Sequence, residues 1–119
     1  EGEKIEVWGT GKEIRDFTYI DDLINGIRAL IKSNIDKPTN IGSDEYVSVD
    51  ELAQTIIHTS GKKKISIKHI KGPHSVTSRN FSTKLIRSTG WKPQFSLKQG
   101  IFIHYQWVKS QVEKKYGKQ

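Results

Sequence analysis

Two glycines and an arginine lie close together near the start of the sequence, in the run Gly9-Thr10-Gly11-Lys12-Glu13-Ile14-Arg15. Glycine permits positive φ angles and lets backbone N–H groups approach a ligand, while the guanidinium of arginine presents a planar set of donors to an anion. A helical pattern begins a few residues later, and helix N-termini favour anions. The spacing indicates an anion-binding turn, although a plain hairpin turn before a helix has the same pattern.

Several neighbouring side chains have a second interpretation. Arg15 either binds a diphosphate or forms an ion pair with Asp16 or Asp21, and we take it as the first candidate for a ligand contact. Trp8 either lies beside a nucleobase or packs in the core, and we favour the core. We expect Gly9 and Gly11 to shape the backbone around the ligand.

The acidic pair Asp21-Asp22 resembles the paired carboxylates of acid–base catalysis. At the start of a helical pattern such acids more often stabilise the positive end of the helix dipole. We therefore expect a capping role for both.

Composition limits the class of protein. A chain of 119 residues, 34% of them hydrophobic, fits one small domain. It has no cysteine, and its histidines (His58, His69, His74 and His104) show no ligand spacing, so we expect neither a disulfide framework nor a metal site. The net charge of +7 favours anionic partners without identifying them.

Nothing in the sequence suggests a membrane or secretory segment. No apolar run approaches the roughly 20 residues that span a bilayer, and the first residues have no signal-peptide character. We expect a cytoplasmic protein without a membrane partner. Because methionine is absent, we also expect a piece of a longer polypeptide.

Hydrophobic periodicity predicts a small mixed α/β lobe with four helices, and the chain reads as one unit over residues 1–119. The predicted strands cover residues 3–8, 14–17 and 65–70. The predicted helices begin at a Thr18–Asp21 capping box, at a Ser48–Glu51 capping box, at Ser82 and at Ser96. Residues 39–43 are too short and too glycine-bounded for a helix.

Five short motifs follow one another in the chain: Gly9-x-Gly11-x-x-x-Arg15-Asp16-Phe17, Asn40-Ile41-Gly42-Ser43, Ser48-Val49-Asp50-Glu51, Gly90-Trp91-Lys92-Pro93 and Ser96-Leu97-Lys98-Gln99-Gly100-Ile101. In this order they resemble the C-terminal half of the extended short-chain dehydrogenase/reductase family, the NAD-dependent nucleotide-sugar epimerases and dehydratases. The resemblance covers residues 5–113. Within that family the pattern is most similar to the GDP-mannose 3,5-epimerases, from which the chain departs by having Thr77 where they have an arginine.

The resemblance implies a longer enzyme whose two halves have different roles. An N-terminal Rossmann half would bind NAD and carry the Tyr-x-x-x-Lys catalytic pair, and this chain would close over the nucleotide sugar without catalytic residues of its own. Tyr105 and Lys109 have the catalytic spacing, but they follow the substrate-lobe motifs and are expected to be structural. No cofactor is expected in this chain, and the parent enzyme is expected to be a homodimer, while a monomer stays open for the chain itself.

The resemblance also extends the set of candidate binding residues. Arg79 and Asn80 follow Gly72-Pro73, where relatives place groups that bind the diphosphate, and Lys71 assists through its charge. An exposed loop arginine without a ligand is the alternative for Arg79. The expected partner is a nucleotide-diphosphate sugar.

Two other functions fit parts of the sequence. The basic charge and the helices after Ser48 and Ser82 fit a winged helix-turn-helix that binds DNA, but a strand and a Gly-Pro loop separate them where that motif has a turn of about 3–4 residues. We therefore expect no nucleic-acid partner. A non-catalytic module that binds nucleotide sugars stays open.

Overall fold

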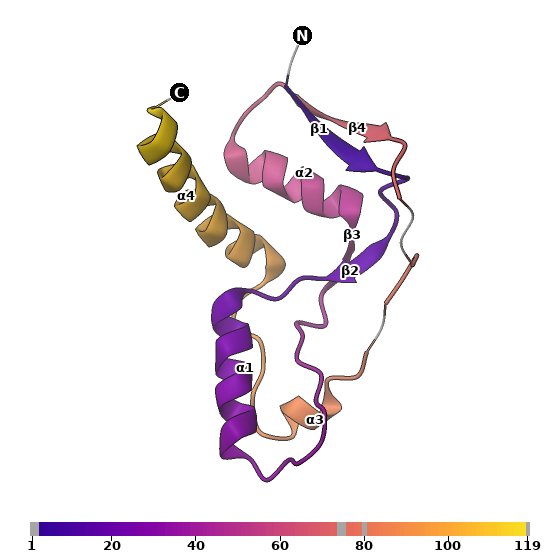
Figure 1. Cartoon of the computed structure of the whole chain (residues 1–119), viewed down its shortest axis with the longest axis vertical. Coiled ribbons are helices and arrows are strands. Elements are labelled where there is room, and N and C mark those ends of the chain that lie inside the picture. The colour runs from indigo at the N-terminus through magenta and orange to yellow at the C-terminus, as the bar shows by residue number, and fades with distance from the viewer. Residues whose placement is uncertain (1–2, 74–75, 80, 119) are drawn as a thin grey trace.

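The computed structural model describes residues 3–73, 76–79 and 81–118, and its elements are shown in Figure 1. The order is β1 (Glu3–Trp8), β2 (Ile14–Asp16), α1 (Ile20–Lys32), β3 (Tyr46–Ser48), α2 (Val49–Ser60), β4 (Ile65–Ile70), α3 (Lys84–Arg87) and α4 (Leu97–Tyr116). Four helices and short strands confirm the predicted mixed α/β lobe.

Strands β1 and β4 form a parallel pair, in register from Glu3 opposite Ile65 to Trp8 opposite Ile70. Alternate residues of a strand point to opposite faces, so Ile5 and Val7 of β1 share one face with Ile65 and Ile67 of β4. Helix α2 covers that face and buries Val7. The alternating patterns of residues 3–8 and 65–70 were therefore correct indicators of half-buried strands.

A second small sheet pairs β2 with β3 in antiparallel orientation, with Arg15 opposite Val47. Strand β3 was not predicted, because its three residues run directly into the capping box of α2. That capping box is present: the Ser48 side chain accepts from the N–H of Glu51, and Glu51 accepts from the N–H of Ser48. Gly61 ends α2 in the left-handed conformation, as predicted.

The start of α1 differs from the prediction. The residue before the helix is Tyr19, in extended conformation, and no side chain caps the helix, so the predicted Thr18–Asp21 capping box is wrong. Asp21 is exposed and lies in the first turn, as a dipole role requires. Asp22 instead has a tertiary role, because it is 1% exposed and accepts hydrogen bonds from the N–H groups of Gln94 (2.9 Å) and Phe95 (3.0 Å).

The last two helices match the sequence pattern with one correction. Helix α4 begins at the predicted Ser96 cap, whose hydroxyl accepts from the N–H of Gln99, and the Gln99 side chain completes a capping box. The short helix α3 follows Thr83 rather than Ser82, and the Ser82 hydroxyl accepts from the N–H of Lys84 at 3.3 Å. The expected cap thus lies one residue further from the helix.

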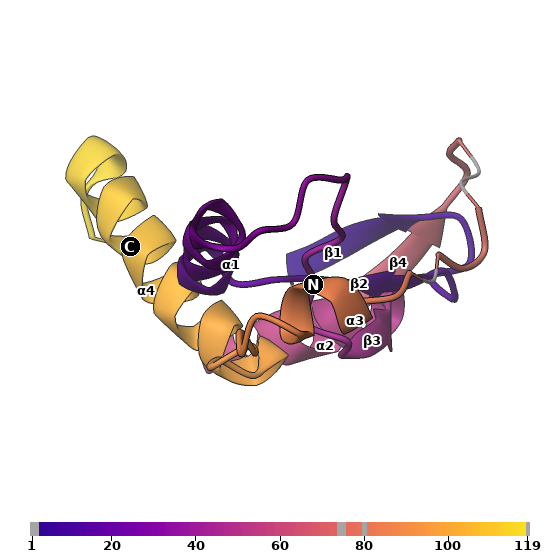
Figure 2. The ribbon, with the colours of Figure 1, turned by 90° about the horizontal axis from the view of Figure 1, so that it is seen from below.

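The molecule is long and thin, with extents of 56 × 34 × 20 Å. Figure 2 shows the C-terminal part of α4 projecting away from the β1–β4 sheet. Among the described residues, the buried apolar side chains are Val7, Ala53, Ile86 and Trp91. Helix α2 packs against β1, β3 and β4, whereas α1 packs mainly against α3 and α4 against α2, so few apolar side chains are enclosed.

None of the helices in the described ranges has the length and apolarity to cross a bilayer.

Candidate functional site

The glycine turn between β1 and β2 is built as the sequence predicts, with positive φ at Gly9 (78°) and Gly11 (71°). The N–H of Gly9 donates to the carbonyl of Ile70 at 2.9 Å, so the turn starts from the end of the parallel pair. A Cβ on Gly11 would lie 1.9 Å from Asp50 Oδ1. The turn therefore lies directly against the N-terminus of α2.

The first backbone N–H groups of α2 already donate hydrogen bonds, two of them to this turn. The N–H of Val49 donates to the carbonyl of Glu13 (3.1 Å), the N–H of Asp50 donates to the carbonyl of Gly11 (2.9 Å), and the N–H of Glu51 donates to the Ser48 hydroxyl. These are the groups that would otherwise attract an anion. Any phosphate at this turn must accordingly be held by side chains.

Arg15 lies in the middle of β2 and is half-buried. Its Nη1 donates to the carbonyl of Ile14 at 2.7 Å, and its Nη2 donates to the carbonyl of Val76 at 2.6 Å. The guanidinium thus joins β2 to the chain that follows Gly72-Pro73, more than sixty residues away. The guanidinium lies between β2 and the segment at Val76, outside the apolar core.

Residues 76–79 continue the β2–β3 sheet on the side of β2. The N–H of Ile14 donates to the carbonyl of Thr77 at 2.8 Å, and Ile14 forms a parallel bridge with Ser78. Arg15 and Arg79 each follow one of the two bridged residues in the sequence. The structure therefore brings the segments that carry the two predicted arginines side by side.

The remaining predicted residues lie around the same turn, with one exception. Lys71 is exposed at the start of the segment that ends at Arg79. Asn80 lies outside the described residues.

Trp8 differs from the expected core packing, because its side chain is 60% exposed. It is the last residue of β1 and points away from the face that α2 covers. A Cβ on Gly72 would lie 2.6 Å from Trp8 Cγ, so the backbone of residue 72 lies against the side chain. This exposure leaves an aromatic surface at the entrance of the segment that carries Lys71 and Arg79.

Tyr105 and Lys109 lie one turn apart on α4, whose main packing partner is α2. They stand on a different element from the turn and from residues 71–79. Their placement agrees with a structural role.

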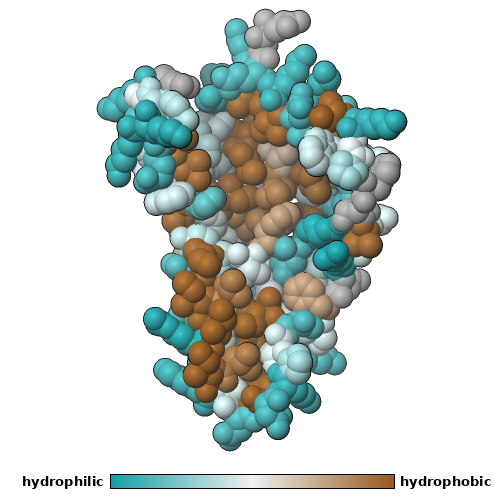
Figure 3. All heavy atoms as spheres, in the orientation of Figure 1, coloured by the Kyte–Doolittle hydropathy of each residue, from teal (hydrophilic) through white to brown (hydrophobic). Residues whose placement is uncertain are grey.

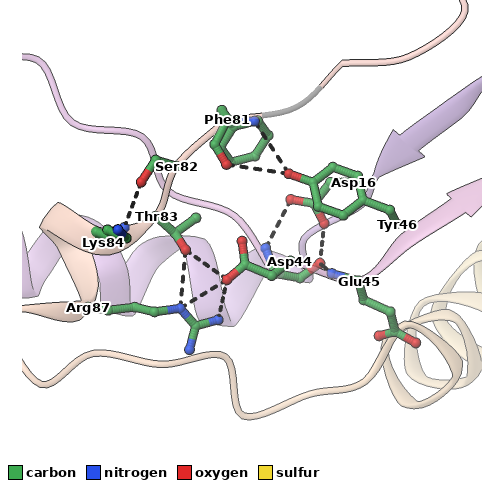
Figure 4. Close-up of polar contacts among 10 residues, drawn as sticks. Asp16, Asp44, Glu45, Tyr46, Phe81, Ser82, Thr83, Lys84 and Arg87 are labelled. Carbon is green, nitrogen blue, oxygen red and sulfur yellow. Dashed lines mark hydrogen bonds and ion pairs between the residues drawn. The ribbon is translucent and has the colours of Figure 1, made fainter.

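Sequence reasoning missed the polar contacts that hold the far side of the site in place, shown in Figure 4. Asp16 accepts hydrogen bonds from the backbone N–H and the hydroxyl of Ser43. Asp44, with φ of 60°, accepts from the Thr83 hydroxyl (2.7 Å) and from Nε (3.0 Å) and Nη2 (2.7 Å) of Arg87. The polar run Gly42-Ser43-Asp44 was the available signal, since aspartate tolerates positive φ in turns.

The chemistry of this arrangement is recognition of an anion by guanidinium and ammonium groups around a tight turn. Within the described residues, no cluster of three histidine, aspartate or glutamate side chains could hold a metal ion. The turn also differs from a dinucleotide-binding turn, because a strand follows it instead of a helix with a free N-terminus. These residues do not fit the diphosphate of NAD.

Three comparisons relate the chain to known proteins. A model of the NAD dependent epimerase/dehydratase family matches residues 1–42. GDP-mannose 3,5-epimerase of Arabidopsis thaliana is 43% identical over 98% of this chain and 31% of its own length.

Two solved structures share the fold. UDP-glucuronic acid 4-epimerase from Bacillus cereus, a Y149F mutant in complex with a fluorinated UDP-glucuronic acid and NAD, has a TM-score of 0.79 and 29% identity over 89% of this chain and 35% of that one. UDP-glucose 4-epimerase from Thermotoga maritima has a TM-score of 0.82 over 94% of this chain and 37% of that one, at 22% identity.

The chain spans about a third of the length of the curated relatives that it matches. Its similarity to them nevertheless extends over almost all of its own residues, in sequence and in fold. The ordered motifs, the sequence relatives and the shared fold together make this chain similar to proteins of the NAD-dependent epimerase/dehydratase family.

Proposed function

We propose that this chain is the nucleotide-sugar-binding lobe of an NAD-dependent epimerase or dehydratase, and that it holds its substrate by the diphosphate. The observation that carries the proposal is the bridge between Ile14 and Ser78, which joins the segments of Arg15 and Arg79 next to the glycine turn. Guanidinium groups from two neighbouring segments can match the charge and the oxygen spacing of a diphosphate. Lys71 adds positive charge on the same segment.

The proposed substrate is a nucleoside diphosphate sugar, with GDP-mannose as the first choice because of the similarity to GDP-mannose 3,5-epimerase. In such enzymes NAD supplies the hydride acceptor that makes the sugar carbon acidic. This chain contributes binding energy at the diphosphate and at the base, which fixes the sugar ring against groups elsewhere in the parent enzyme. On its own the chain is expected to bind weakly and to show no turnover.

The exposed face of Trp8 supports a place for the base. An aromatic side chain that is 60% exposed at the end of β1 offers a flat surface next to Lys71. Stacking between an aromatic ring and a nucleobase contributes about 1–3 kcal/mol. The base, the diphosphate and the sugar would then follow the line from Trp8 to Arg15.

The test is a titration of the ¹⁵N-labelled chain with GDP-mannose, followed by NMR. We expect shifts confined to residues 8–15, 71 and 76–79. Arg79→Ala should weaken binding about tenfold, because a charge-assisted hydrogen bond contributes about 1.5–3 kcal/mol. Arg28→Ala, an exposed arginine on α1, is the matched control and should bind like the unchanged chain.

The proposal fails if millimolar GDP-mannose leaves these resonances unmoved, or if both arginine variants bind equally. A duplex oligonucleotide that binds with a steep salt dependence would instead favour the nucleic-acid alternative.

A further inference from the structure

The two segments that carry the candidate arginines start from neighbouring points at one end of the parallel pair. Strand β1 leads through the glycine turn to Arg15, and β4 is followed by Lys71 and by the segment of Arg79. The N–H of Gly9 donates to the carbonyl of Ile70 at 2.9 Å, which is one bond between the two starting points. A second contact at this place is made by side chains.

That second contact is a hydrogen bond between His69 of β4 and Asp50 of α2, with 2.8 Å between Nε2 and Oδ1. A carboxylate only accepts hydrogen bonds, so the Nε2 of His69 carries a proton and donates it. His69 lies opposite Val7 in the register and therefore on the face of the strand pair that α2 covers. The bond joins the end of β4 to the first turn of α2.

Asp50 also holds the glycine turn. Its N–H donates to the carbonyl of Gly11 at 2.9 Å, and its carboxylate occupies the place that a Cβ on Gly11 would take. The same carboxylate accepts from His69. Together with the bond between Gly9 and Ile70, these contacts close a ring that contains the glycine turn, the end of β4 and the start of α2.

The contact between His69 and Asp50 is partly open to water. The two side chains are 45% and 30% exposed, and Figure 3 shows the apolar surface of its view mainly along α1 and in the hollow between α4 and α2. Water screens a charged contact at such a place, so the contact adds little to the stability of the fold. The pair is therefore better suited to fixing a local geometry than to holding the fold together.

We propose that His69 and Asp50 are positioning residues for the diphosphate site. Their hydrogen bond fixes the start of the Arg15 segment relative to the start of the Arg79 segment, and this proposal rests on the proposed function. Guanidinium groups from two segments bind both phosphoryl groups of a diphosphate at once only if the segments keep a fixed separation. A single phosphoryl group makes no such demand.

The first experiment compares a diphosphate ligand with a monophosphate one. The dissociation constants of GDP and of GMP are measured by NMR titration for the unchanged chain and for His69→Leu. The variant should weaken GDP binding about fivefold, the upper end for a partly exposed charged contact, and GMP binding about twofold or less. His69→Gln retains an N–H donor for the Asp50 carboxylate and should restore most of the affinity for GDP.

An ion pair at the other end of the same strands supplies the matched control. Lys62, which follows α2, lies 3.0 Å from a carboxylate oxygen of Glu3, the first residue of β1. This pair also links the α2 region to the strand pair, but at the end away from the glycine turn. Lys62→Ala should leave the dissociation constants of GDP and GMP unchanged.

The second experiment needs no ligand. Hydrogen exchange of the Gly9 amide, which donates to Ile70, reports local opening between the turn and β4. His69→Leu should accelerate this exchange about fivefold. The amide of Gly100, which donates to Ser96 at 2.9 Å at the start of α4, is the reference and should exchange at an unchanged rate, which also shows that the variant stays folded.

Four results would overturn the proposal: equal weakening of GDP and GMP binding by His69→Leu, no weakening of either, no recovery of GDP binding in His69→Gln, or unchanged exchange at Gly9. The proposed function is tested separately by the unchanged chain. If that chain binds neither GDP nor GMP, the proposed function fails, and the exchange rate of Gly9 alone decides whether the pair fixes the two segments.

Discussion

Gly11 is the residue on which the glycine turn most depends, because two constraints act on it at once. Its φ of 71° lies in the left-handed region that side chains disfavour, and the carboxylate of Asp50 occupies the place of a Cβ. The carbonyl of Gly11 also accepts from the N–H of Asp50. The turn and the start of α2 therefore form one unit, which sets the position of β2 and Arg15.

Gly11→Ala is predicted to lower the free energy of unfolding by about 3 kcal/mol, from left-handed strain of about 1–2 kcal/mol and the clash with Asp50. Gly61→Ala is the matched control, because Gly61 has a φ of 68° and no atom within 4 Å of a Cβ. The Gly61→Ala variant should lower the free energy of unfolding only by the left-handed backbone strain, about 1–2 kcal/mol. Urea unfolding followed by circular dichroism measures both, and equal losses would show that the contact with Asp50 does not matter.

At the scale of the elements, Asp22 joins α1 to the turn before α4. Both of its carboxylate oxygens accept backbone N–H groups, and its own carbonyl accepts from the Trp91 indole at 3.1 Å. Two segments about seventy residues apart are held together by one buried side chain. The path of the chain into α4 depends on this contact.

Asp22→Ala is predicted to lower the unfolding free energy by about 3 kcal/mol or more, because two buried N–H groups lose a charged acceptor. Asp21→Ala, at the exposed neighbouring position, should change it by about 0.5 kcal/mol or less. The midpoints of thermal unfolding compare the two. Similar midpoints for both variants would contradict the role assigned to Asp22.

Local features of the elements were readable from the sequence, and distant pairings were not. The capping boxes at Ser48 and Ser96 and the left-handed end at Gly61 depend on residues within one turn, so their patterns were sufficient. Strand β3 exists only because β2 lies opposite, about thirty residues earlier.

The same contrast between local and distant features holds for the candidate site. The types of Arg15 and Arg79 suggested anion binding, but the segments that carry them are joined by a bridge between Ile14 and Ser78 that no local pattern shows. Trp8 was assigned to the core because tryptophan is usually well buried, whereas its position in β1 places it on the face that α2 does not cover.

At the scale of the whole molecule, the large exposed surface predicts an unusual response to denaturant. The slope of unfolding free energy against urea scales with the surface that unfolding exposes. Because this chain already exposes 8917 Å², about 2,300 Å² more than a compact monomer of its mass, we expect a slope about a fifth below the usual value for its length. A normal slope would contradict the extended shape.

The parallel pairing of β1 with β4 has a consequence for synthesis. Glu3 finds its neighbour Ile65 only after about sixty further residues have left the ribosome, and closing a loop of that length is slow and entropically unfavourable. Within this chain, β1 therefore cannot pair with β4 until α1 and α2, which lie between them, have been synthesised. Chaperones that bind emerging extended segments would meet Ile5 and Val7 during this interval.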